Sequence, residues 1–172
     1  CLEDQLETVD SSCSFVLPNY VPSLIASDNC NTLSVTQNPL PGTVLTAGTT
    51  TVTVTASDGS FDTLCSFTII VTDQTAPTAI CQNIILPLDQ NGLASIATTD
   101  IDFGSSDNCG SIISSLDSTT FSCNDLGDNL VVLTITDQGG LTSTCNAMVT
   151  VVDTLAPQIF TQDIIVYLDA NG

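Results

Sequence analysis

The chain has 172 residues, contains no Lys, Arg or His, and carries a formal net charge of −19 at pH 7. Because no side chain can neutralise phosphate, nucleic acid is excluded as a partner, and an anionic membrane surface would repel these residues. Side chains cannot form salt bridges with one another either, so clustered carboxylates must be hydrated or balanced by metal ions. No apolar run of about 20 residues is present, and no membrane insertion of this segment is expected.

Strands are predicted along the whole chain, and helical periodicity is absent. Hydrophobic residues alternate with Thr, Ser or other polar residues in four segments, at 52–54, 67–71, 133–135 and 147–151. This period of two, rich in Val, Ile and Thr and bounded by Asp, Asn and Gly, is typical of half-buried strands. About seven short strands in 80 residues indicate a β-sandwich of the immunoglobulin or fibronectin type. The fold class is therefore predicted to be all-β.

The chain repeats itself at an offset of 80 residues. Residues 71–92 recur without a gap as residues 151–172, including the aspartate and proline of the linker between units. A fixed period indicates tandem copies of one fold. The predicted domains are a first repeat at 1–76, a second at 77–156, and the first strand and turn of a third at 157–172. Short linkers stiffened by proline predict that the sandwiches stack end to end as a semi-rigid rod.

Eight cysteines are distributed as four in each repeat. Three of them recur between the repeats and the fourth does not, since Cys13 and Cys123 occupy different places; the recurring ones are Cys1, Cys30 and Cys65, with Cys81, Cys109 and Cys145. The close Cys pairs of zinc sites are absent. Widely spaced cysteines in small β units predict disulfides and an oxidising, extracellular setting. Three connectivities are possible within each repeat.

Several motifs together resemble a known family. Ser-Asp-Asn-Cys occurs at 27–30 and again at 106–109, and strand motifs ending in Thr-Asp occur at 65–73 and 133–137. These residues are similar to HYR (hyalin-repeat) domains, especially the tandem repeats of giant Bacteroidetes surface proteins, including gliding-motility adhesins. The resemblance implies an immunoglobulin-like fold, secretion (often by the type IX system), a cell-surface location and a role in adhesion. It names no ligand.

An immunoglobulin-like fold favours one set of disulfides. The first strand of such a sandwich can run parallel to the last, which favours Cys1–Cys65 and Cys81–Cys145. The remaining cysteines would then pair within their own repeats, as Cys13–Cys30 and Cys109–Cys123. These four pairs are a hypothesis, because the spacing of the cysteines leaves the alternatives open.

The acidic residues predict a calcium site between the repeats. Five aspartates fall in loops that a sandwich places at the pole facing the preceding repeat, and a sixth ends the last strand of the first repeat and enters the junction: Asp28, Asp58, Asp102, Asp107 and Asp137, with Asp73 as the sixth. The last four are able to converge between the two repeats, with Asn108 nearby. Oxygen ligands without nitrogen suit Ca²⁺, which would offset their repulsion and lock the joint. The alternative is that these aspartates only cap turns, and no EF-hand loop is present.

Catalysis is not expected, because His and Lys, the usual proton-transfer side chains, are absent. Three short Asp-Ser/Thr motifs resemble Bacteroidetes O-glycosylation sites and make Thr63, Ser118 and Thr154 candidates for modification. The sequence therefore predicts a structural repeat segment of a secreted adhesin or filament, whose partners are neighbouring repeats and, through lateral assembly, other copies. The alternative is an extracellular module that binds a glycan or protein through its loops.

Overall fold

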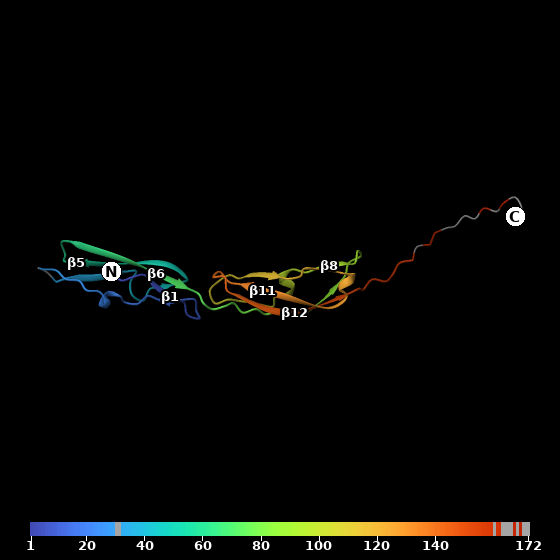
Figure 1. Ribbon diagram of the computed structural model, residues 1–172, viewed down its shortest axis with the longest axis horizontal. Helices are drawn as coiled ribbons and strands as arrows, with labels where there is room; N and C mark the ends of the chain where they lie inside the picture. The colour runs from blue at the N-terminus through green and yellow to red at the C-terminus, as the bar shows by residue number, and fades with distance from the viewer. Residues whose placement is uncertain (30–31, 160, 163–166, 168, 170–172) are drawn as a thin grey trace.

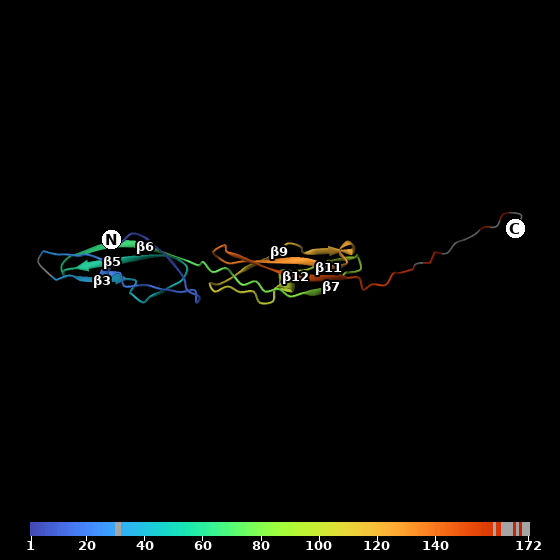
Figure 2. The ribbon, with the colours of Figure 1, turned by 60° about the horizontal axis from the view of Figure 1, so that its bottom comes forward.

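The computed structural model describes residues 1–29, 32–159, 161–162, 167 and 169. Cys30 and most of the predicted third repeat lie outside these described residues. Figure 1 shows two β units that follow one another along the long axis of the molecule, and the turned view of Figure 2 shows the same end-to-end order. Within the described part of the chain, no helix is long and apolar enough to cross a membrane.

The first repeat is built from two sheets. Its elements are β1 (Gln5–Thr8), β2 (Phe15–Val16), the short 3-10 helix η1 (Val21–Ser23), β3 (Ser34–Asn38), β4 (Val44–Leu45), β5 (Gly48–Ser57) and β6 (Asp62–Thr72). A four-stranded sheet has the order β1-β6-β5-β3, and a two-stranded sheet pairs β2 with β4. The long hairpin of β5 and β6 forms the centre of the larger sheet.

The second repeat has the same plan. Its elements are β7 (Ile84–Pro87), β8 (Leu93–Ser95), the one-turn helix α1 (Thr98–Ile101), β9 (Ile113–Leu116), β10 (Thr120–Ser122), the 3-10 helix η2 (Cys123–Asp125), β11 (Gly127–Thr136) and β12 (Thr142–Val152). The larger sheet has the order β7-β12-β11-β9, and the smaller pairs β10 with β8. Among the described residues each repeat thus has six strands, where the sequence predicted about seven and no helix.

The first strand of each repeat runs parallel to the last. In the first repeat Gln5 of β1 lies opposite Ile69 of β6, and in the second Ile84 of β7 lies opposite Val149 of β12. All other strand pairs are antiparallel hairpins or neighbours. This arrangement confirms the predicted immunoglobulin-like all-β sandwich and places the end of β1 beside the end of β6.

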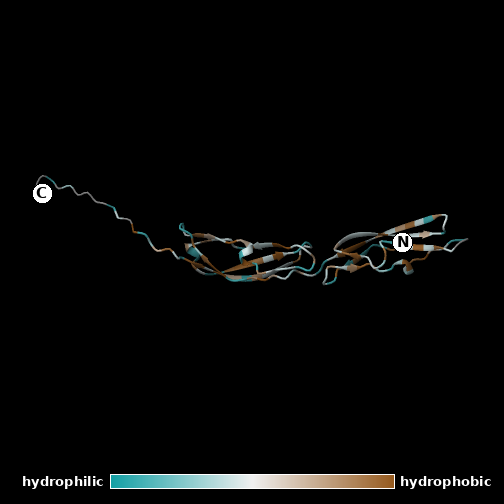
Figure 3. Cartoon of the chain, turned by 180° about the vertical axis from the view of Figure 1, so that it is seen from behind, coloured by the Kyte–Doolittle hydropathy of each residue, from teal (hydrophilic) through white to brown (hydrophobic). Residues whose placement is uncertain are grey.

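Each sandwich holds its own hydrophobic core. The side chains that alternate along the central strands point inward, so that Val52 and Ile69 in the first repeat and Leu133 and Val149 in the second are fully buried. Figure 3 shows these hydrophobic positions as bands along the strands of each unit. The two buried clusters share no residue, so the repeats are stabilised separately.

One disulfide links the first and last strands of each repeat, as predicted. Cys1 is bonded to Cys65 and Cys81 to Cys145, with Cα–Cα distances of 5.5 and 5.8 Å. Both bonds have a sequence separation of 64, and they join the segment before the first strand to the first half of the last strand. On the chain-entropy model each stabilises its repeat by roughly 4 kcal/mol.

Candidate functional site: the joint between the repeats

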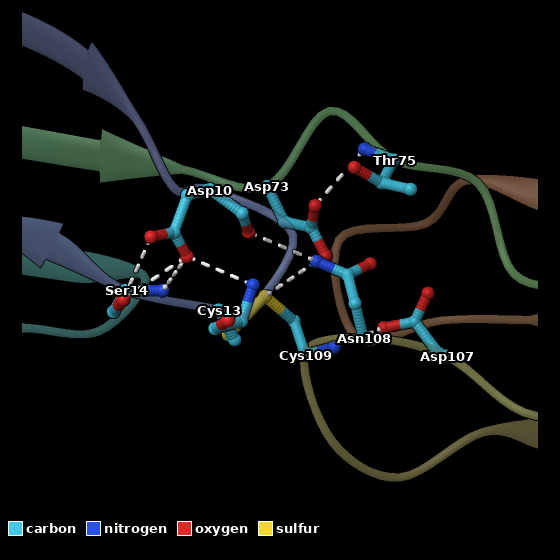
Figure 4. The surroundings of a disulfide bond; sticks show 9 residues. Asp10, Cys13, Ser14, Asp73, Thr75, Asp107, Asn108 and Cys109 are labelled. Carbon is cyan, nitrogen blue, oxygen red and sulfur yellow. Dashed lines mark hydrogen bonds between the residues drawn. A yellow bond between two sulfur atoms is a disulfide. The ribbon is translucent and has the colours of Figure 1, made fainter.

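A third disulfide crosses from one repeat to the next. Cys13 is bonded to Cys109, with a Cα–Cα distance of 4.9 Å and a sequence separation of 96. Figure 4 shows this bond between the turn that follows β1 and the loop that precedes β9. The predicted pairs Cys13–Cys30 and Cys109–Cys123 are therefore wrong.

The poles of the sandwiches explain this correction. A disulfide requires Cα atoms within about 7 Å of each other. Cys13 lies at the end of the first repeat that meets the second, whereas Ala26–Asp28, just before Cys30, line a hollow with Asp58 at the opposite end. Cys109 lies at the joint, whereas Cys123 contacts the Gly92 carbonyl at the far end of the second repeat. A bond between Cys109 and Cys123 would have to span the length of the second sandwich, and Cys13 is already bonded to Cys109.

A tight turn presents Cys13 to the second repeat. The Oδ1 atom of Asp10 accepts hydrogen bonds from the backbone N–H groups of Ser12 and Ser14, at 2.8 and 3.0 Å. Cys13 N–H donates to the Asp10 carbonyl at 3.0 Å, and Cys13 has a φ of 56°. The bonds from Ser14 and Ser12 lower the pKa of the Asp10 carboxyl below its ordinary value. The turn is thus held in shape by an ionised aspartate.

Polar contacts accompany the disulfide across the joint. The side-chain amide of Asn108 donates to the backbone carbonyl of Asp10 at 3.4 Å (Figure 4). On the other side of the joint, Thr78, the residue that follows the linker, forms a pair of backbone bonds with Ser106 of the second repeat, at 2.7 and 3.0 Å. Pro77 between these contacts is buried. The C-terminal end of the linker is therefore fixed to the second repeat through buried Pro77 and the paired Thr78.

Three carboxylates meet at the same joint. One oxygen from each of Asp73, Asp107 and Asp137 lies within 4.8 Å of the other two. Asp73 comes from the end of β6 in the first repeat, Asp107 from the loop before β9, and Asp137 from the turn between β11 and β12. The structure thus brings together three of the four aspartates that the sequence predicted to converge there.

Hydrogen bonds orient these carboxylates but leave oxygens without partners. Asp73 Oδ1 accepts from Thr75 N–H at 2.9 Å, Asp107 Oδ2 from Cys109 N–H at 2.7 Å, and Asp137 Oδ1 from Leu141 N–H at 2.8 Å. Asp137 is only 5% exposed. Its Oδ2 atom is buried without a hydrogen-bond partner, as is the Oδ1 atom of Asp107.

The Oδ1 atom of Asn108 is the third buried oxygen without a partner, and it belongs to the same loop. Buried polar atoms normally have a partner, because an unmade hydrogen bond costs about 1–3 kcal/mol. Here no basic side chain exists to supply one. Three clustered carboxylates, with an unpartnered amide oxygen on the residue next to Asp107, supply the kind of oxygen donors that Ca²⁺ prefers. The residues present therefore fit a calcium ion.

The other predicted ligands lie elsewhere. Asp102 forms an isolated bridge with Cys81, and its Oδ1 accepts from Ser105 N–H at 2.8 Å, so it is not part of the carboxylate trio. Bonds from the Ser105 side chain and backbone lower its pKa. Asp28 and Asp58 lie together at the opposite pole of the first repeat, around a shared hollow. They hold the places there that Asp107 and Asp137 hold at the joint.

The candidate glycosylation residues are distributed over both repeats. Thr63 is exposed on β6 and Thr154 is exposed after β12, whereas Ser118 is half-buried between β9 and β10. They do not form one surface with the joint. Their modification remains a prediction.

Comparison with known proteins finds only distant structural similarity. No protein-family model matches the chain, and no curated protein matches it. Among solved structures, human protocadherin-24 EC1-2 is 14% identical, with 88% of this chain and 95% of that one covered and a TM-score of 0.34. Human mucin-like protocadherin EC1-2 is 11% identical, with coverages of 88% and 97% and a TM-score of 0.43. A variant endo-fucoidan hydrolase of glycoside hydrolase family 107 is 12% identical, with coverages of 90% and 28% and a TM-score of 0.32. With TM-scores below 0.5, these similarities assign no function.

Proposed function

We propose that the chain is a structural repeat segment of a secreted cell-surface adhesin or filament, whose joints are stiffened by disulfides and by Ca²⁺. The proposal is supported by the end-to-end sandwiches, by the disulfides and by the sequence motifs that resemble HYR repeats of Bacteroidetes surface proteins. Under this proposal the segment is extracellular, and its first partners are the neighbouring repeats. Gliding motility and type IX secretion are implied only by that resemblance, and lateral assembly with other copies is a further part of the proposal.

Two connections between the repeats limit their relative motion. The linker joins them through the backbone at Asp73–Pro77, and the Cys13–Cys109 bond joins them at a second point. A single connection allows bending and twisting about itself, whereas two separate connections leave only rotation about the line between them. An ion held by side chains of both repeats would block this remaining rotation.

Calcium at this joint would also reduce the electrostatic repulsion among the three carboxylates. Three carboxylates within 4.8 Å of one another repel, by about 3 kcal/mol per pair at an effective dielectric constant near 20. A divalent cation between the carboxylates would offset this repulsion, and the unpartnered oxygens of Asp107 and Asp137 could coordinate it. When bound, the ion supplies only charge and coordination, and the chain performs no reaction under this proposal.

The observation that carries the calcium proposal is that Asp137, whose carboxylate clusters with two others, has a buried oxygen without a hydrogen-bond partner. It is tested by calorimetric melting and small-angle X-ray scattering of the full chain with CaCl₂ and with EDTA. We expect Ca²⁺ to raise the melting temperature and to narrow the distribution of maximum dimensions. Asp137→Asn should remove most of both effects.

Glu3→Gln is the matched control, because Glu3 is exposed and lies outside the joint while the variant loses the same charge. It should respond to Ca²⁺ like the unmodified chain. Equal melting temperatures and equal scattering with Ca²⁺ and EDTA would rule out the calcium joint. A flexible chain of independent units even with the disulfide formed would rule out the stiff rod.

One observation favours the alternative of a ligand-binding module. The hollow at the far pole of the first repeat is lined partly by apolar side chains, and Ile25 and Phe61 there are 101% and 81% exposed. A printed glycan array probed with the full chain tests this reading. Binding that Phe61→Ser abolishes without changing the scattering curve would support a loop-based ligand site.

A further inference from the structure

Cys123 is the one described cysteine that is not part of a disulfide, and it is exposed. Its side chain lies at the end of the second repeat that faces away from the first. The Sγ atom is 3.7 Å from the backbone carbonyl oxygen of Gly92. The geometry of the turn that contains Gly92 shows why the position of the Cys123 side chain matters.

This turn matches the turn that holds Cys13 in the first repeat. In one, Asp10 Oδ1 accepts from the N–H groups of Ser12 and Ser14; in the other, Asp89 Oδ1 accepts from those of Asn91 and Leu93, at 2.8 and 2.9 Å. The residue before the last of these donors has positive φ in both turns. It is Cys13 with φ 56° in the first repeat and Gly92 with φ 73° in the second.

Cys123 occupies the space that a side chain at Gly92 would take. A Cβ atom built on Gly92 would lie 2.5 Å from the Cys123 Sγ atom, closer than any ordinary contact. The second repeat therefore has a glycine in this turn where the first has Cys13, and the sulfur beside that position comes from η2 instead of the β7–β8 turn. The sulfurs of Cys13 and Cys123 thus lie at corresponding places in the two repeats, although the two residues do not correspond in sequence.

The linker next to this thiol also repeats the geometry of the joint. Asp153 Oδ1 accepts from Leu155 N–H at 2.9 Å, and Asp73 Oδ1 accepts from Thr75 N–H at 2.9 Å. The far end of the second repeat thus carries an equivalent of every group that the first repeat contributes to its joint: the turn aspartate, the linker aspartate and the sulfur.

We infer that Cys123 forms a disulfide with the cysteine of a following repeat that corresponds to Cys109. The inference rests on the proposed array. It means that a disulfide links each repeat to the next, as Cys13–Cys109 links the first two. Each unit would use one cysteine at its far pole, Cys13 or Cys123, and the Ser-Asp-Asn-Cys cysteine at its near pole. Intra-repeat pairing is then confined to the Cys1–Cys65 type of bond.

The bond forms by oxidation of two thiols. The thiolate of one cysteine attacks glutathione disulfide, and the second thiolate then displaces glutathione from the mixed disulfide. Overall, two thiols and one molecule of glutathione disulfide give one protein disulfide and two molecules of glutathione. The oxidant therefore takes up the two electrons and two protons that the cysteines lose.

The test uses the full chain and a chain with one repeat added, in which residues 1–156 are followed by residues 77–172. Both are oxidised with a glutathione buffer, alkylated with iodoacetamide, and mapped without reduction. Pepsin at low pH is used because trypsin has no Lys or Arg to cleave at. In the full chain Cys123 should be alkylated almost completely. In the longer chain it should be protected and linked to Cys109 of the added copy.

Two controls are internal to the longer chain. The Cys13–Cys109 bond of the first joint should form, and Cys123 of the added copy should remain alkylated, because nothing follows it. Cys123→Ser in the first copy should leave Cys109 of the added copy reactive. Combining Cys123→Ser with Gly92→Cys should restore the link, now from the turn position that Cys13 occupies in the first repeat.

The outcomes separate this inference from the proposed function. If Cys123 is alkylated in the longer chain while Cys13–Cys109 forms, the inference is overturned and the array proposal stands. If the double variant forms the link but the unmodified Cys123 does not, the inference is overturned as well. If neither joint forms a disulfide although Cys81–Cys145 forms in each copy, the covalent joint of the proposed function also fails.

Discussion

A carboxylate oxygen of Asp73 lies within 4.8 Å of one of Asp137, although the two residues belong to different repeats. Asp73 ends the last strand of the first sandwich, and Asp137 begins the β11–β12 turn of the second. Like charges at this distance separate unless something holds them. The Cys13–Cys109 bond and the docked linker hold them here, so the joint has an acidic site whose occupancy should control its stability.

Replacing Asp73 by Asn should not lower the melting temperature without calcium, but it should reduce the stabilisation that calcium provides. In EDTA the variant loses one repulsive charge, so its melting temperature should equal or exceed that of the unmodified chain. In CaCl₂ it loses one ligand, so the rise caused by calcium should shrink. Calorimetry in both buffers measures the two shifts, with Glu3→Gln as the control for charge alone. A variant that melts lower than the parent by the same amount in both buffers would contradict the electrostatic explanation.

Removing the inter-repeat disulfide should loosen the joint without unfolding either repeat. In the double variant Cys13→Ser, Cys109→Ser, the two cores and the bonds Cys1–Cys65 and Cys81–Cys145 are unchanged. Small-angle scattering in EDTA should show a broader distribution of maximum dimensions, while the far-ultraviolet circular dichroism spectrum stays the same. The matched comparison is Cys1→Ser, Cys65→Ser, which should instead lower the stability of the first repeat by roughly 2–5 kcal/mol. A double variant at the joint that lost its β signal would show that the repeats depend on each other.

A core substitution should affect only the repeat that contains it. Ile69 is fully buried in the first cluster, and Ile69→Ala should destabilise that repeat by about 2–5 kcal/mol. Ile70 follows it on the same strand but points outward and is 41% exposed, so Ile70→Ala should cost much less. Denaturant unfolding followed by hydrogen exchange distinguishes the repeats. Equal loss of protection in both repeats would argue against two separate cores.

Acid should abolish the contribution of the turn aspartate Asp89 to the free energy of unfolding. Bonds from the backbone N–H groups of Leu93 and Asn91 lower the pKa of Asp89 below its ordinary value of 3.8. Because the folded state favours the ionised form, the stabilisation is complete above pH 3.8 and is lost as the pH falls through the lower folded pKa. The difference in unfolding free energy between the parent and Asp89→Asn, measured in EDTA, should therefore shrink below pH 4. A difference that grew as the pH fell would have the wrong sign.

Much of this architecture follows from local sequence patterns. Alternation of Val, Ile and Thr predicted the strands, because side chains on a strand point to opposite faces in turn. The recurrence of residues 71–92 as 151–172 predicted two similar units and placed Asp73 at their junction. Strand order in an immunoglobulin-like sandwich then brought Asp107 and Asp137 to the same pole, and it paired Cys1 with Cys65. These inferences needed only the direction of each strand.

The partners of Cys13 and Cys109 needed the folded structure. Counting four cysteines in each repeat suggested that bonds close within a repeat, whereas a disulfide responds only to the distance between Cα atoms. That distance depends on the pole at which each cysteine lies. One signal was present, since Cys13 stands in the turn where the second repeat has Gly92, but its meaning depended on the positive φ that both residues share.

The sequence by itself determined the strands, the repeat, the absence of any internal cation and the acidic character of the joint, because these depend on composition and local periodicity. The tertiary structure decided which cysteines bond, that Asp102 stays apart from the other three aspartates, and that Cys123 fills the place of a missing turn side chain. Those results depend on contacts between residues far apart in sequence, within the second sandwich and between the two sandwiches where they meet, and such contacts leave no periodic pattern in the sequence.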